Sequence, residues 1–150
     1  MVNLTNAYNI PEKVSVFKQE IINEVQEIGL DSPDIERLLD TLISVTVKDF
    51  KLVKTEKGVS NEGQILSGNK LLVNICIKEK TMYVADYKTQ PVHAECFETH
   101  KSFFIILPED ANECDIEENL KVTPYIESFE AKMLDARHIQ KCIMLLINVN

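Results

Sequence analysis

The chain has 150 residues, of which 45% are hydrophobic and 27% are charged, a composition typical of one globular domain and unlike that of a disordered chain. Its 24 acidic and 16 basic residues give a net charge of −8. This balance argues against non-specific binding to nucleic acid or to an anionic membrane surface, because both need basic residues. No window approaches the roughly 20 consecutive apolar residues that a membrane-spanning helix needs.

Residues 1–13 are polar, contain Pro11 and are predicted to form an N-terminal arm before a single domain over 14–150. Met1 to Ile10 lack a cationic region followed by an apolar one, so we expect no secretory signal and synthesis in the cytoplasm.

The segment 14–28 can be interpreted in two ways. Its apolar residues follow helical spacing, and Gly29 is placed as a C-terminal cap: Val14, Phe17, Ile21, Val25 and Ile28. A strand through part of residues 16–28 stays open as the alternative. A short helix is predicted at 33–40, with Pro33 at its first position after Ser32.

From residue 42 onward the hydrophobic period changes to two, which predicts strands. The stretch between Gly58 and Gly68 is glycine-punctuated and is expected to be a loop or hairpin. The predicted strands are Leu42–Leu52, Lys70–Ala85, Pro91–Thr99, Ser102–Leu107, Val122–Leu134 and Ile139–Val149. Along Lys70–Ala85, the odd positions from Leu71 to Ile77 are apolar and the even ones are more polar. Together these elements predict a mainly β, single-domain antiparallel sandwich or barrel.

Two segments hint at chemistry without completing a motif. The segment 63–70 resembles a phosphate-binding loop, but Asn69 separates the second glycine from Lys70 and a strand follows instead of a helix. The segment 93–100 holds two histidines, a cysteine and two glutamates, but alternation on a strand separates them. Cys96 and His100 share a face about 13 Å apart, so a metal ion would need ligands from other strands. We therefore expect no metal, no cofactor and no catalytic residue. The residues from Asp135 to His138 are predicted to form a turn with an Asp–Arg ion pair.

The four cysteines, at positions 76, 96, 114 and 142, contain no C-x-x-C pair, so they are expected to be free thiols made in a reducing compartment. Cys76, Cys96 and Cys142 fall on the more polar parity of their strands, although cysteine is usually buried. Either another layer covers that face, or some of these thiols cross-link neighbouring subunits once conditions become oxidising.

The chain resembles the SPOCS domain, a module of clostridial spore-envelope morphogenesis proteins of the SipL type. The resemblance covers roughly residues 15–150 and lies in Ser32-Pro33-Asp34-Ile35-Glu36, Gly58 to Leu71, Met82-Tyr83-Val84-Ala85-Asp86, Gln90-Pro91-Val92-His93-Ala94, Phe103 to Pro108 and Val122-Thr123-Pro124-Tyr125-Ile126-Glu127. It implies a β-rich, non-enzymatic assembly module, made in the mother cell and placed in the spore surface layers, coat or exosporium. A LysM module often follows in this family, whereas this chain ends at Asn150.

We therefore expect a structural module that binds itself or another spore-envelope protein, through sheet edges or the 1–13 arm. The candidate interaction surface is Tyr83, Tyr87, Gln90 and His93, and the candidate intermolecular thiols are Cys76, Cys96 and Cys142. The alternative is a small-ligand or glycan-binding β-domain that uses Tyr83, Tyr87 and the 86–91 turn as a stacking platform.

Overall fold

The computed structural model describes residues 3–4, 10–11, 16–63, 65–66, 68–108 and 119–150. They form a four-stranded sheet in the order β1-β3-β6-β7, a three-stranded sheet in the order β2-β9-β8 and a small β4-β5 hairpin. The strands are β1 (Asn3–Leu4), β2 (Val16–Glu27), β3 (Ile35–Lys54), β4 (Gly58–Val59), β5 (Ile65–Leu66), β6 (Asn69–Ala85), β7 (Val92–Ile106), β8 (Val122–Met133) and β9 (His138–Val149).

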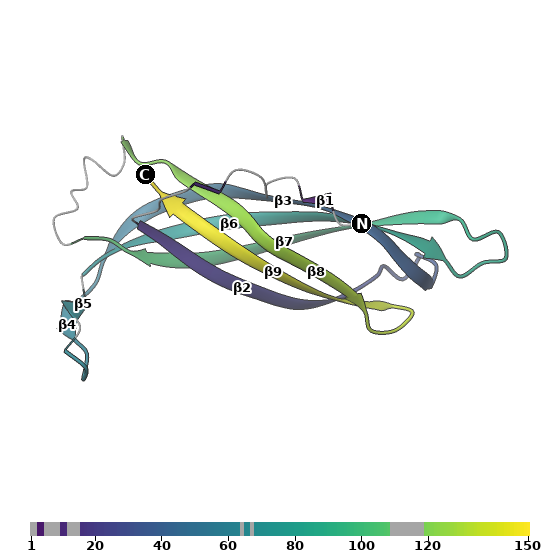
Figure 1. Cartoon of the computed structure of the whole chain (residues 1–150), viewed down its shortest axis with the longest axis horizontal. Helices are drawn as coiled ribbons and strands as arrows, with labels where there is room; N and C mark the ends of the chain where they lie inside the picture. The colour runs from purple at the N-terminus through teal and green to yellow at the C-terminus, as the bar shows by residue number, and fades with distance from the viewer. Residues whose placement is uncertain (1–2, 5–9, 12–15, 64, 67, 109–118) are drawn as a thin grey trace.

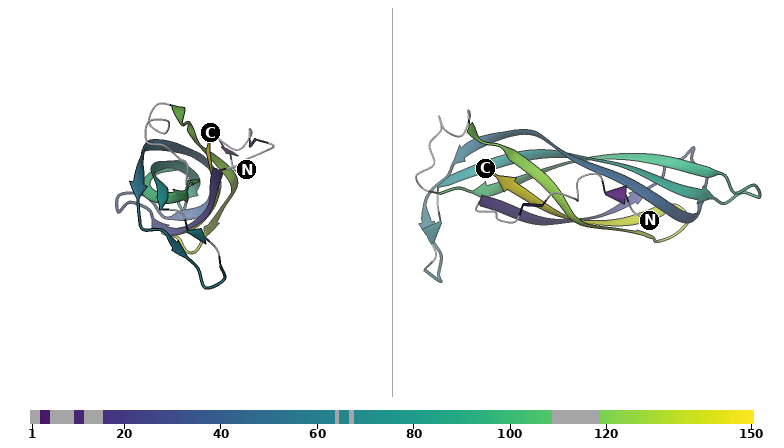
Figure 2. Two further views of the ribbon diagram at one scale, coloured as in Figure 1. Left: turned by 90° about the vertical axis from the view of Figure 1, so that its left-hand side faces the viewer. Right: turned by 45° about the horizontal axis from the view of Figure 1, so that its top comes forward.

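The two large sheets are long, twisted and packed face to face, so the molecule is elongated along its strands (Figures 1 and 2). Every strand pair is antiparallel except β1, which pairs in parallel with β3 at Leu42 and Ile43. No strand pairing joins the two sheets among the described residues. The β-sandwich expected from the sequence is confirmed, and the barrel alternative is not formed.

The main core lies between the sheets and is built from alternate residues of the central strands. On β6 the odd positions from Leu71 to Ile77 are almost fully buried, as the alternation predicted. On β9 the odd positions from Ile143 to Val149 face them. A second, smaller cluster at the other end of the sandwich contains Ile28, Ile35, Tyr83, Ala85 and Ile139.

The helix predicted at 33–40 is wrong, because β3 begins at Ile35 and pairs with β6. Register shifts lie between Ile35 and Arg37 and between Leu38 and Asp40. Each bulge adds a residue, so Ile35 and Leu38 both pack on the smaller cluster although they are three positions apart. Bulges therefore produced the helix-like spacing.

The structure also decides two further stretches of the chain. The segment 16–27 is a strand, so the extended alternative holds there, and residues 14–15 lie outside the described part. The two strands predicted at 91–99 and 102–107 are one continuous strand, β7, paired with β6 throughout. The glycine-punctuated stretch forms the β4-β5 hairpin, with Gly63 at a φ of +83° in its turn. No helix long and apolar enough to cross a membrane occurs in the described residues.

A buried polar layer separates the two hydrophobic clusters. Lys141 Nζ on β9 lies 2.8 Å from Glu79 Oε2 on β6, and the two side chains are only 1% and 3% exposed. Gln26 donates a hydrogen bond of 2.9 Å to the same carboxylate oxygen. The Lys141 ammonium also lies 4.2 Å from the centre of the Phe97 ring. Burial lowers the pKa of Lys141, while the Glu79 carboxylate opposes that change.

We expect Lys141→Ala to lower the free energy of unfolding by about 3–5 kcal/mol, because it leaves the Glu79 carboxylate buried without its ion-pair partner. Urea denaturation measures this loss. The double variant Glu79→Leu with Lys141→Met removes both charges and is expected to recover most of the stability. Lys51→Ala, at an exposed position of β3, is the control, and a loss in Lys141→Ala no larger than in this control would contradict the prediction.

Candidate interaction face

Strand β2 directs several charged side chains towards the other sheet and several apolar side chains outward, the inverse of an ordinary surface strand. Its even positions face the other sheet and include Lys18, Glu20 and Glu24, whereas its odd positions face outward. The inward charges have partners: Glu24 lies 2.9 Å from Lys101 of β7, and Lys18 lies 3.3 Å from Glu20. Ile22 and Val16 also face inward and pack on the main core, whereas Phe17, Ile21 and Val25 are left on the outside.

Ten outward positions of β2 and the adjacent central strand β9, next to the Glu27–His138 pair at one end, form a surface that we call the uncharged face. It consists of Phe17, Gln19, Ile21, Asn23 and Val25 from β2 and Gln140, Cys142, Met144, Leu146 and Asn148 from β9. None of these ten positions is charged, in a chain whose residues are 27% charged. The uncharged face therefore differs in composition from the chain as a whole.

The apolar residues of this face are well exposed. Ile21 is 63% exposed, Val25 58%, Phe17 44% and Met144 41%. Ile21 and Met144 are directly paired across the β2-β9 ladder, so their side chains lie next to each other. Exposed apolar side chains gathered on one face, as here, are a common feature of interaction surfaces.

A polar contact joins the two outer strands of this sheet across the central strand β9. Gln19 on β2 donates hydrogen bonds of 3.2 Å to both carboxylate oxygens of Glu127 on β8. Strands β2 and β8 lie on either side of β9. Leu146 of β9 is paired with Gln19 of β2 and with Tyr125 of β8, so it lies between the two residues. Leu146 is only 3% exposed although it points outward, as expected beneath this bridge. Nearer the other end, a hollow of about 560 Å³ is lined by residues of all three strands, Cys142 among them.

The three candidate thiols lie in different environments. Cys76 on β6 points to the outer side of its sheet as expected, but it is only 1% exposed, which corrects its assignment as an intermolecular thiol. Cys96 on β7 is exposed and Cys142 on β9 is partly exposed. All three are free thiols, and Cys114 lies outside the described residues.

The candidate interaction surface is only partly exposed. Tyr83 is fully buried and donates a hydrogen bond of 2.8 Å to the Pro33 carbonyl, so it does not belong to the surface. His93 is half-buried, with its ring centre 5.4 Å from that of Tyr83. Tyr87 is 60% exposed, and Gln90 has a positive φ of 46° and bonds Glu36. A stacking platform of two tyrosines is therefore not formed.

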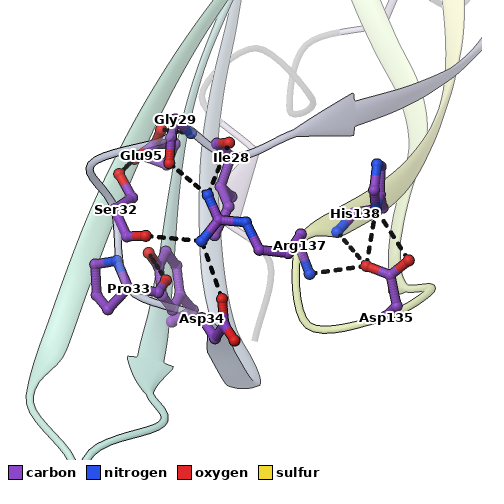
Figure 3. A network of polar contacts seen from close by, with 10 residues as sticks. Ile28, Gly29, Ser32, Pro33, Asp34, Glu95, Asp135, Arg137 and His138 are labelled. Carbon is purple, nitrogen blue, oxygen red and sulfur yellow. Dashed lines mark hydrogen bonds and ion pairs between the residues drawn. The ribbon is translucent and has the colours of Figure 1, made fainter.

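A polar network beside Tyr83 holds the connection from β2 to β3 (Figure 3). The Arg137 guanidinium donates to the carbonyls of Gly29 and Ser32 at 2.6 and 2.8 Å and pairs with Asp34 at 3.0 Å. Glu95 accepts hydrogen bonds from the Gly29 N–H at 2.6 Å and the Ser32 hydroxyl at 2.7 Å. Arg137 thus stabilises the connection between β2 and β3, which passes from one sheet to the other.

The turn expected at 135–138 is present, but its ion pair differs from the prediction. The Asp135 carboxylate accepts hydrogen bonds from the backbone N–H groups of Arg137 and His138, each at 2.8 Å. The N–H of Arg137 and the His138 ring lower the pKa of Asp135. The guanidinium of Arg137 instead reaches Asp34.

The outer face of the other sheet carries a hollow of about 440 Å³, within the size range of small-ligand sites. Leu42 and Ser44 of β3, Lys78 and Lys80 of β6, and Cys96 of β7 line it. This hollow has the size of a small-ligand site and does not involve the two tyrosines.

Comparison of the chain with known protein families, with curated proteins and with solved structures finds no significant match. The resemblance to SPOCS domains stays a prediction from the sequence, although the β-rich fold that it implies is the one observed.

We predict that thiol labelling follows exposure: Cys96 reacts first, Cys142 more slowly, and Cys76 only after unfolding. Burial also raises the pKa of Cys76, so less of the reactive thiolate is present at a given pH. Single-cysteine variants in a Cys114→Ser background, followed with a chromogenic disulfide reagent, measure the three rates. Labelling of native Cys76 as fast as that of Cys96 would contradict the burial described here.

Proposed function

We propose that the chain is a non-enzymatic assembly module that binds a second copy of itself through the uncharged face. The observation that carries this proposal is the inverted polarity of β2, which places Phe17, Ile21 and Val25 outside while Lys18, Glu20 and Glu24 face the other sheet. Burying this strip against a partner would remove its apolar surface from water, at about 25 cal/mol for each Å².

Charge favours a second copy as the occupant. Each chain carries a net charge of −8, so two copies repel wherever their acidic surfaces meet. A contact confined to the ten positions of the uncharged face would set no like charges opposite one another. Charged residues border these positions, Glu27 on β2 and Glu127, Glu130 and Lys132 on β8. A two-fold arrangement would also make the contact self-complementary, the commonest geometry of homodimers.

The resemblance to SPOCS domains supplies the proposed setting, the surface layers of a bacterial endospore. There the module would bind itself or another envelope protein, and Cys142 on the uncharged face could strengthen the assembly as an intermolecular disulfide. The alternative of a small-ligand or glycan-binding domain has less support, because Tyr83 of its platform is buried.

Association through this face should be weakened by a charge at its centre. We expect Ile21→Glu to weaken the dimer at least about tenfold, roughly 1.4 kcal/mol, because a carboxylate would be desolvated in the contact. Sedimentation equilibrium over a range of concentrations measures the effect.

Val92→Glu is the matched control. Val92 is 65% exposed, close to the 63% of Ile21, but lies on β7 in the other sheet. This variant should associate like the original chain. Equal weakening by both variants, or a monomer at every concentration of the unmodified chain, would overturn the proposal.

Cross-linking gives a second test. The order of rates that it should show is the reverse of the order that thiol exposure alone would give. With a short bifunctional thiol reagent, a chain that retains Cys142 and lacks Cys96 and Cys114 should form covalent dimers faster than one that retains Cys96 and lacks Cys142 and Cys114. Mono-functional labelling should show the reverse order, because Cys96 is the more exposed thiol. Faster dimer formation through Cys96 would place the contact on the other sheet.

A further inference from the structure

Three potential metal ligands meet on the outer surface of the four-stranded sheet. Cys76 of β6 is the register partner of His100 of β7, and Glu98 lies two residues before His100 on the same face. One ligand atom from each of the three residues lies within 4.8 Å of the other two. The sequence suggested that a metal site near His100 would need a ligand from another strand, and β6 supplies the sulfur atom.

Two of the three distances between ligand atoms are close to the edges of a tetrahedral zinc site, and the third, from sulfur to nitrogen, is at most 4.8 Å. The Cys76 sulfur lies 3.5 Å from Glu98 Oε1, and His100 Nε2 lies 3.1 Å from the same oxygen. Usual zinc–ligand bond lengths give edges of about 3.6 Å between sulfur and oxygen and about 3.4 Å between nitrogen and oxygen. The histidine side chain is 65% exposed, so its ring can adjust towards the sulfur.

From this geometry we propose that Cys76, Glu98 and His100 bind one divalent transition-metal ion, with zinc as the preferred ion. Thiolate, imidazole and carboxylate are the three protein ligand types that zinc uses, and three ligands leave a fourth position for water. One thiolate and one carboxylate neutralise the two positive charges of the ion.

Binding requires the Cys76 thiol to release its proton to solvent as the sulfur–metal bond forms. Affinity is therefore expected to rise with pH, because protons compete with the metal ion for the thiolate and the imidazole.

The test is titration of the purified full-length chain with Co²⁺ in a Cys114→Ser background, followed by displacement with Zn²⁺. We expect one ion per chain, with a thiolate-to-cobalt charge-transfer absorption that zinc abolishes. Cys76→Ser should remove that absorption, and His100→Ala, at an exposed position that does not threaten folding, should weaken binding at least tenfold.

Two control variants distinguish binding at this site from binding elsewhere on the chain. Cys96→Ser, on the same strand as Glu98, should leave the absorption unchanged, and Ile21→Glu should do the same, because the site does not depend on self-association. Absence of the absorption in the unmodified site, or its persistence in Cys76→Ser, would overturn the proposal.

Discussion

The packing of two sheets on one shared core is the constraint on which the other features of the molecule rest. Because side chains alternate along a strand, burying one face of each sheet fixes which residues are left outside. The odd positions of β6 and β9 fill the core, so the even positions of both strands must face away from it. The uncharged face on one sheet and the Cys76–Glu98–His100 cluster on the other are both consequences of that choice.

A buried polar layer interrupts the hydrophobic core, and contacts with and near this layer explain why β2 directs charged and polar side chains inward. Midway along the sandwich, the Glu79–Lys141 pair replaces apolar packing, and Gln26 of β2 joins it. Near it, Glu24 of β2 pairs with Lys101 across the sheets. The inward side of β2 thus serves polar contacts between the sheets. Ile22 still packs in the core, but Phe17, Ile21 and Val25 remain on the outside, where association with another molecule would bury them.

The two proposals concern opposite outer faces and different forces. Association through the uncharged face would draw on the burial of apolar surface, and the absence of charge there limits repulsion between acidic copies. Metal binding would draw on two anionic ligands and an imidazole held in register by neighbouring strands. Since the sites lie on separate sheets, each can be lost without the other, and this separation makes their tests independent.

Alternation of apolar and polar residues was enough to predict the β-rich class and the buried side of β6. Successive side chains of a strand point to opposite faces, so a two-residue hydrophobic period marks the face that is buried. The same reasoning could not assign β2 or the start of β3. The four-residue spacing of Phe17, Ile21 and Val25 fits one face of either a helix or a strand, and the bulges after Ile35 imitate a helix. The meeting of Cys76 with His100, 24 positions later, was set by the β6-β7 register. Contacts of this kind follow from the folded sheet alone, since strand register depends on the long-range packing of a whole face and not on neighbours in the chain.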